Sequence, residues 1–407
     1  MAELNDFRTR VREFLATHAD TAGTDASSRG RHDDGDAVVA RGKAFQNALA
    51  DAGLAALTYP VEFGGAGLDA EHQKVFDEES NGYEMPSRQF MVGIGICAPT
   101  LLEHGTDEQR RDYLPALLRA DAVWCQLFSE PGAGSDVASL QTRAERDGDE
   151  WVVNGQKVWT SGAHYADYGL LVARTNRDVP KHRGITMFVC DMHAPGVTSR
   201  PLRQIDGRAH FNEVFLDDVR LPADAVVGEV DDGWRVTLAM LANERVAIGA
   251  GGSSQSLSSD GFGSVLRLAR ARGRTGDPVV RQELADLYVL ERILGLLGMR
   301  IREALVSGRA PGPEGSVAKL AATILGKQSA SLGMAIAGAG SLAWDAEQVD
   351  GGDPASAFLF APMLGIAGGT TEIQKNIIGE RVLGLPKDPA VDKDVPFREL
   401  LVGTQAK

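Results

Sequence analysis

The spacing of hydrophobic and polar positions changes twice along the chain. Near the start, four apolar side chains recur at intervals of three and four residues, the spacing of one helix face: Leu4, Phe7, Val11 and Phe14. Further on, Thr106 is followed three residues later by Gln109, which matches a capping box at a helix start. We therefore expect residues 1–120 to form a helical domain.

The second region, residues 121–230, has the pattern of strands. Short runs such as WVVNG, GLLVAR and ITMFVCD are rich in β-branched and aromatic residues and are separated by Gly, Pro and Asp. From Gly233 onward, long segments of broad apolar content return, which predicts buried helices over residues 231–407. The order helical, sheet, helical predicts a multi-domain α+β protein.

Composition and charge narrow the class of protein. The 407-residue chain is 43% hydrophobic, as is ordinary for a globular protein, and its net charge of −14 argues against nucleic-acid binding. A polyphosphate ligand would need a local basic pocket. The sequence has no apolar run long enough to span a membrane and no apolar signal-peptide core at its start, so we expect a cytoplasmic protein without a membrane association.

The cysteines give no sign of a disulfide or a metal site. Cys97, Cys125 and Cys190 are far apart, odd in number and without metal-ligand spacing. We predict buried, inert thiols and no bound metal.

The segment GIAGGTTEIQKNIIGERVLGLP, from Gly365 to Pro386, has the pattern of a ligand-facing helix start. Its paired glycines allow close approach of the backbone, and the first N–H groups of a following helix face polar or anionic atoms. Thr371 with Gln374 fits a capping box. The alternative is a well-capped structural helix.

Two upstream segments decide between these alternatives: LFSEPGAGSD, Leu127 to Asp136, and WVVNGQKVWTSGAHYADYGLLVAR, Trp151 to Arg174. Together with the C-terminal segment, and in this order, they resemble the acyl-CoA dehydrogenase flavoproteins over nearly the whole chain. The resemblance implies an N-terminal α-helical domain, a middle β-barrel-like domain and a C-terminal four-helix bundle. It also implies FAD, held between the last two domains.

The resemblance implies a set of cofactor contacts. Three residues would line the flavin ring, Trp159 and Ser161 would flank it, and Ser135 would meet the pyrophosphate and the substrate. The ring-lining residues are Gln126, Phe128 and Ser129; Gly369, Thr371 and Gln374 would contact the ribityl and adenine side. The alternatives are that Trp159 is a core aromatic residue and that Ser135 closes a turn.

The expected reaction needs a carboxylate over the α-carbon of the thioester. Many family members carry it where this chain has Gly368, and a second group, including isovaleryl- and long-chain-type enzymes, carries it before an arginine on the first long helix of the C-terminal domain. Here Glu244 precedes Arg245 on such a helix, and interrupts an apolar face. We predict that Glu244 is the base and that Gly368 lies at the substrate.

Alternatives remain for these charged residues. Glu244 could form an internal salt bridge, and Glu372 could replace it as base, although the helix dipole explains a glutamate in a first helical turn. Arg245 could fix the backbone near the base, bind a coenzyme A phosphate or form an ordinary ion pair.

Two segments depart from the family pattern. RLARARGRTGDPVVRQ replaces the arginine-containing segment that reaches the flavin from a neighbouring subunit, which leaves Arg270, Arg272 and Gln282 as candidates. AIAGAGSLAWDAEQVDGGDPASAFLF replaces a glutamine-and-glycine segment. These changes, with GPEGSVAKL at Gly312 to Leu320, resemble bacterial members that act on bulky acyl chains, some as mixed complexes.

We therefore expect FAD-dependent conversion of an acyl-CoA thioester to trans-2-enoyl-CoA. Glu244 would take the pro-R α-proton, and electrons would pass to an electron-transfer flavoprotein. The resemblance implies a homotetramer or dimer, or a hetero-oligomer with a sister subunit. Two rival interpretations are a flavin monooxygenase or oxidase on the same fold, and a non-catalytic partner subunit.

Overall fold

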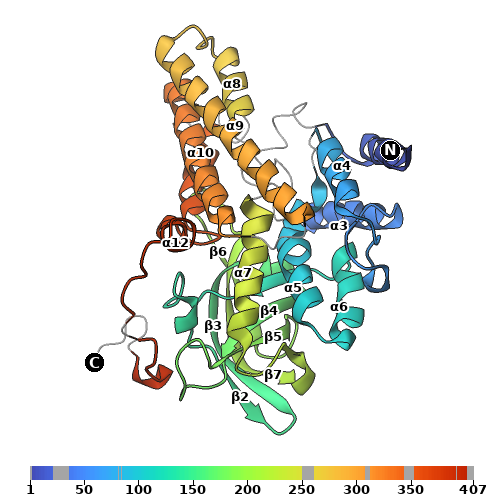
Figure 1. Ribbon diagram of the computed structural model, residues 1–407, viewed down its shortest axis with the longest axis vertical. Helices are drawn as coiled ribbons and strands as arrows, with labels where there is room; N and C mark the ends of the chain where they lie inside the picture. The colour runs from blue at the N-terminus through green and yellow to red at the C-terminus, as the bar shows by residue number, and fades with distance from the viewer. Residues whose placement is uncertain are drawn as a thin grey trace.

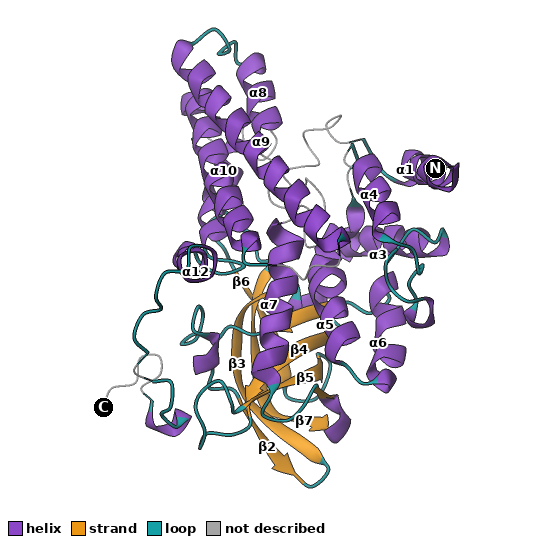
Figure 2. Ribbon diagram, viewed as in Figure 1, coloured by secondary structure: helices purple, strands orange, loops and turns teal. Residues whose placement is uncertain are grey.

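The order of elements along the chain is helical, sheet and helical, as the sequence predicts (Figure 2). The computed structural model describes residues 2–21, 36–80, 82–83, 85–249, 261–307, 312–342, 353–390 and 392–400.

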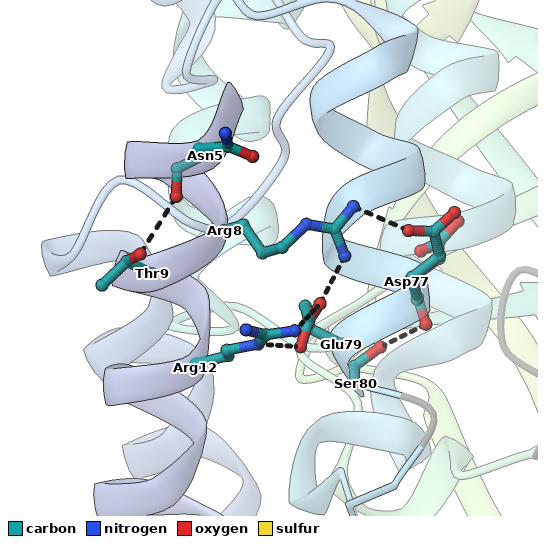
Figure 3. A network of polar contacts seen from close by, with 8 residues as sticks. Asn5, Arg8, Thr9, Arg12, Asp77, Glu79 and Ser80 are labelled. Atoms are coloured by element: carbon teal, nitrogen blue, oxygen red, sulfur yellow. Dashed lines mark hydrogen bonds and ion pairs between the residues drawn. The ribbon is translucent and has the colours of Figure 1, made fainter. Parts of the chain in front are cut away.

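The first region is built from helices that bury one apolar face each. They are α1 (Ala2–His18), α3 (Asp36–Asp51), α4 (Ala70–Ser80), α5 (Ala98–His104) and α6 (Asp107–Arg119). Phe7, Val11 and Phe14 of α1 are buried, which confirms the predicted helix face. On the outer side, Arg8 and Arg12 of α1 bond to Glu79 of α4, with 2.6 Å between Arg12 Nε and the Glu79 carboxylate (Figure 3).

The predicted capping box opens α6 and attaches it to the middle region. Gln109 N donates to Thr106 Oγ1 at 3.2 Å, and Thr106 N donates to Gln109 Oε1 at 3.1 Å. The amide of Gln109 also donates to the carbonyls of Asp224 and Val226. One side chain therefore caps the helix and joins two domains.

The middle region is a single sheet of eight strands within the described residues. The strands are β1 (Trp124–Leu127), β2 (Arg143–Asp147), β3 (Glu150–Ser161), β4 (Tyr168–Arg174), β5 (Ile185–Asp191), β6 (Val197–Leu202), β7 (Phe211–Pro222) and β8 (Val226–Val227). Their spatial order is β6-β7-β3-β2-β4-β5-β8, and β1 pairs in parallel with β4. Both faces carry a buried apolar cluster, because β4 and β5 are apolar on both sides.

The last region is helical, with α8, α9 and α10 forming a tall bundle (Figure 1). Its helices are α7 (Gly233–Gly249), α8 (Phe262–Ala271), α9 (Pro278–Val306), α10 (Glu314–Ala337), α11 (Asp353–Phe360) and α12 (Thr371–Ile377). Helix α7 connects the regions, because it packs against α5, β5 and α10. Of the described helices, none is both long and apolar enough to cross a bilayer.

The three cysteines are buried and unpaired with one another, as predicted. Burial raises the pKa of Cys190 to about 12, so this thiol is not a nucleophile at neutral pH. Within the described ranges, no cluster of three or more His, Cys, Asp and Glu side chains could hold a metal ion.

Candidate active site

A bulge in β3 turns Trp159 out of the sheet. The pairing of β3 with β7 shifts register between Lys157 and Thr160. Val158 is buried, whereas Trp159 is 61% exposed and has φ 62°, a left-handed conformation that costs a non-glycine residue about 1–2 kcal/mol. Its ring meets Phe211 edge-on, with 6.0 Å between centroids. A strained, exposed tryptophan is more typical of a ligand site than of a core, which argues against the core alternative.

A buried ion pair fixes the chain next to this bulge. Lys157 Nζ donates to the Phe128 carbonyl at 3.0 Å and to Glu130 Oε1 at 2.8 Å, and both side chains are almost inaccessible to solvent. Val158 N also donates to the Ser129 carbonyl at 2.8 Å. The segment that leaves β1 is thereby held against the bulge.

The environment of Glu130 keeps its carboxylate ionised. Burial favours the neutral acid, but the Lys157 ammonium and the backbone N–H groups of Gln141 and Thr142 outweigh it and lower the pKa of Glu130. Burial lowers the pKa of Lys157, and Glu130 opposes that shift. This pair was not predicted from the sequence. The sequence did contain a sign of it, because Lys157 is an even number of residues from Trp151 and Val153 in β3 and therefore lies on the same, buried side of the strand.

Glu244 lies on α7, beside strand β1 of the sheet. Its side chain is half-buried, and the Gln126 amide nitrogen of β1 is 3.5 Å from its Oε2. On the same helix face Thr237 is buried and Leu241 packs against the core, as the apolar spacing predicts. The side chains of Arg245 and Ile248 lie outside the described residues.

The paired glycines form the turn before α12. Gly368 and Gly369 have φ of 66° and 89°, values that favour glycine. The Gln374 amide donates to their carbonyls at 2.7 and 3.3 Å, and a Cβ added at Gly369 would lie 2.6 Å from that amide nitrogen. Gln374 therefore closes the turn from the following helix.

The predicted capping box at Thr371 and Gln374 is wrong. Thr370 is the N-cap residue, and its hydroxyl accepts a hydrogen bond from Ile373 N at 3.2 Å. The helix begins one residue earlier than the pattern suggested, so Gln374 lies beyond the capping position and bonds to the glycine turn instead.

Lys319 of α10 anchors this turn. Only 3% exposed, it donates from Nζ to the Leu364 carbonyl at 3.0 Å and to the Gly369 carbonyl at 2.7 Å. Burial lowers the pKa of Lys319, while the negative charges of Glu244 and Glu372 oppose that shift. Lys319 was not predicted as a site residue, although a lysine within the apolar run SVAKLAATIL is the same kind of signal as a glutamate on the apolar face of α7.

The candidate residues thus fall into one main group and two outlying ones. The main group has two parts: Gln126, Phe128, Ser129, Trp159, Ser161 and Glu244 lie along β1, β3 and α7, and Gly368, Gly369, Thr371 and Gln374 form the turn at the start of α12, which Lys319 of α10 holds. Ser135 is exposed in the loop that follows β1. Arg270 and Gln282 are exposed near the α8–α9 turn, at the end of the bundle far from α7 and α12 (Figure 1). Within one chain they do not join the group.

Comparison with known proteins agrees with this arrangement. Models of the N-terminal, middle and C-terminal domains of acyl-CoA dehydrogenases match residues 1–121, 125–219 and 231–383. Acyl-CoA dehydrogenase IpdE1 of Mycobacterium tuberculosis is 38% identical over 395 residues, covering 95% of this chain and 99% of IpdE1. The chain belongs to the acyl-CoA dehydrogenase family. It is an enzyme of that family, and its helical ends and central sheet are the family's fold.

Two further relatives extend the comparison. Acyl-CoA dehydrogenase FadE34 of M. tuberculosis is 43% identical over 344 residues, which is 84% of this chain and 46% of FadE34, so the chain spans about half the length of that relative. Among solved structures, the Tcur3481-Tcur3483 steroid ACAD has a TM-score of 0.79 and 28% identity, and the match covers 95% of this chain and 99% of that one.

Proposed function

We propose that this acyl-CoA dehydrogenase converts a bulky acyl-CoA thioester to its trans-2-enoyl-CoA with FAD, and that Glu244 is the base. The placement of Glu244 carries the proposal. Its half-buried carboxylate lies beside Gln126 and acts on Lys319, which holds the glycine turn, while the usual base position is Gly368. Glu372, the other carboxylate whose charge acts on Lys319, is exposed in the first turn of α12.

The residues present fit FAD. Trp159 offers an exposed aromatic face on a strained bulge, and the backbone and side chains of Ser129 and Gln126 lie on the adjoining segment. A flavin ring needs such a wall and such polar groups along its edge. When bound, FAD supplies the acceptor for a hydride from the substrate β-carbon.

Each candidate residue has a proposed place around this cofactor. Gln126, Phe128, Ser129, Trp159 and Ser161 would hold the ring, Ser135 the pyrophosphate, and Gly369, Thr371 and Gln374 the ribityl and adenine side. Arg270 and Gln282 are remote within one chain and would act from another copy or a sister subunit.

Glu244 performs the proton transfer in this proposal. Its carboxylate takes the α-proton, and the Gln126 amide keeps the carboxylate oriented. The backbone of the Gly368–Gly369 turn polarises the thioester carbonyl, which lowers the cost of removing that proton. Arg245 is the remaining substrate-binding residue predicted from the sequence, and it would bind coenzyme A.

Glu244→Gln tests the assignment. We expect flavin reduction by the substrate to slow by about 10²–10⁴-fold, the usual contribution of a general base, with unchanged flavin content. Glu372→Gln is the matched control, because it removes the other carboxylate that acts on Lys319 from an exposed position. Undiminished reduction in Glu244→Gln, or an equal loss in Glu372→Gln, contradicts the assignment.

A steroid-like acyl group is the proposed substrate class. The similar Tcur3481-Tcur3483 structure is described as a steroid ACAD. In this chain, the π-helical turn Gly93–Cys97 packs on α7, and a Cβ added at Gly95 would lie 3.5 Å from Ala247 Cβ, one turn beyond Glu244. We expect Gly95→Val to lower reduction by bulky thioesters more than reduction by short ones. Equal losses for both classes would remove Gly95 from the acyl site.

The proposed partners are an electron-transfer flavoprotein and further subunits. The name of the Tcur3481-Tcur3483 structure joins two proteins, which favours considering a sister subunit beside a homodimer or homotetramer. Mass measurement of the native protein, alone and after co-expression with a homologous chain as candidate sister subunit, distinguishes these assemblies. Arg270→Ala and Gln282→Ala should lower flavin content only if the site is shared between chains.

A further inference from the structure

Lys319 is buried and has no part in the family-derived set of contacts. Its ammonium lies between the carbonyls of Leu364 and Gly369, at 3.0 and 2.7 Å. A buried lysine is costly unless its charge is compensated, and here two carbonyl dipoles and nearby carboxylates compensate it. The positive charge of Lys319 at the glycine turn therefore has a role other than packing.

Further side chains also fix the turn to which Lys319 bonds. Thr323 Oγ1, one helical turn along α10, donates to the Leu364 carbonyl at 2.8 Å, and the Gln374 amide shares the Gly369 carbonyl with Lys319 at 3.3 Å. Leu364 also approaches α10 so closely that a Cβ at Gly326 would lie 2.3 Å from its Cδ1. A left-handed glycine pair stays in one conformation only when its surroundings fix it in this way.

Helix α10, which carries Lys319, packs against α7, which carries Glu244. Three charged groups act on Lys319 among the described residues: Glu244 of α7, Glu372 of α12, and Lys327 of its own helix. The segment Ala361–Gly365 contributes the Leu364 carbonyl. Lys319 thus bonds to the proposed carbonyl-binding turn and lies on the helix that packs against the helix of the proposed base.

We propose that Lys319 is a positioning residue, which fixes the Gly368–Gly369 turn through two carbonyls and stabilises the ionised carboxylate of Glu244 with its positive charge. The inference rests on the proposed function, since it gives Glu244 the role of base. Many family members carry the base at the turn itself, whereas the proposed base of this chain lies on α7. Lys319 would connect that base with the turn.

Lys319→Met tests both parts, because it keeps the length of the side chain and removes the charge and the donors. We expect amide hydrogen exchange over residues 364–374 to accelerate at least about tenfold, since the turn loses a buried anchor. We also expect the acid limb of the flavin-reduction rate to move up by about one pH unit, because a carboxylate that loses a cationic neighbour protonates more readily. Lys319→Gln, which keeps one donor, replaces Lys319→Met if the latter fails to fold.

Two comparison variants separate the anchoring of the turn from the effect of the Lys319 charge on Glu244. Thr323→Val removes one anchor of Leu364 without changing charge, so it should accelerate exchange and leave the acid limb in place. Lys74→Met removes the same charge from an exposed position on α4 and should change neither measurement. An unchanged acid limb in Lys319→Met, whatever its exchange, reduces Lys319 to a structural residue and overturns the proposal.

The exchange measurement also separates this inference from the proposed function. If no thioester reduces the wild-type flavin, the proposed function fails. Faster exchange in Lys319→Met would then still support the anchoring role, and unchanged exchange would refute it.

Discussion

Two sets of charged side chains in this protein occupy opposite surroundings. Between α1 and α4, Arg8 and Arg12 pair with Glu78 and Glu79 near the surface, where Arg12 and Glu78 are exposed and Glu79 is largely covered (Figure 3). Beside the bulge of β3, Lys157 and Glu130 form a pair that is almost entirely buried. Exposed pairs contribute little to stability, whereas an interrupted buried pair leaves an uncompensated charge.

The comparison indicates what the buried charges do. The surface network joins two helices whose apolar faces are already packed together. The buried lysines instead hold backbone carbonyls: Lys157 holds Phe128, and Lys319 holds Leu364 and Gly369. Both segments belong to the candidate site. A buried cation therefore fixes backbone that apolar packing alone leaves undetermined.

Lys157→Met is the strongest test of this contrast. We expect it to lower the free energy of unfolding by about 3–5 kcal/mol, because the Glu130 carboxylate remains buried without its partner. Urea denaturation measures the change. The double variant Lys157→Met/Glu130→Gln should recover part of the loss, and a single variant as stable as the wild type contradicts the account.

The pH dependence of stability gives a second test. The pKa of Glu130 is lowered below its ordinary value of 4.5, so its contribution to stability is complete above 4.5 and is lost as the pH falls through the lowered pKa. Urea denaturation midpoints at neutral and acidic pH should therefore fall more for the wild type than for Lys157→Met/Glu130→Gln. Parallel losses in the two proteins would show that the pair is not responsible.

The bulge at Trp159 gives a smaller and separate effect. In an ordinary strand glycine is less stabilising than alanine, but φ at Trp159 is 62°. We expect Trp159→Gly to be more stable than Trp159→Ala by about 1 kcal/mol, with both variants losing flavin affinity. Thermal unfolding and flavin release by ultrafiltration measure the two properties. The reverse order of stability would show that the bulge is unstrained.

The surface network should give the smallest effect. Arg12→Ala removes an ion pair with Glu79 from an exposed side chain, which leaves the apolar contacts of α1 in place. Any loss of stability should disappear in about 1 M salt, where the Debye length is about 3 Å. A loss that persists at high salt would mean that the pair acts through packing.

Much of the fold followed from periodicity alone. The apolar face of α1, the capping box at Thr106 and Gln109, and the strand pattern of the middle region are local features, and local features can be predicted from neighbouring residues. The division at residues 120 and 230 stays a prediction of that kind.

The site was only partly predictable because it depends on contacts between distant segments. Glu244 was found because a carboxylate interrupts an apolar helix face. Lys319 carries the same signal, but its partners, Leu364 and Gly369, lie 45 and 50 residues further along the chain. The cap was misplaced by one residue because both Thr370 and Thr371 can cap a helix and only the backbone selects one.

An anaerobic titration of the purified protein with short, long, branched and steroid-like acyl-CoA thioesters tests the central claim most directly. The account predicts that the protein is yellow and that a bulky, steroid-like thioester bleaches its flavin. A flavin that stays oxidised with every thioester contradicts dehydrogenation and favours the oxygenase interpretation, and a colourless protein favours a partner subunit whose site another chain completes.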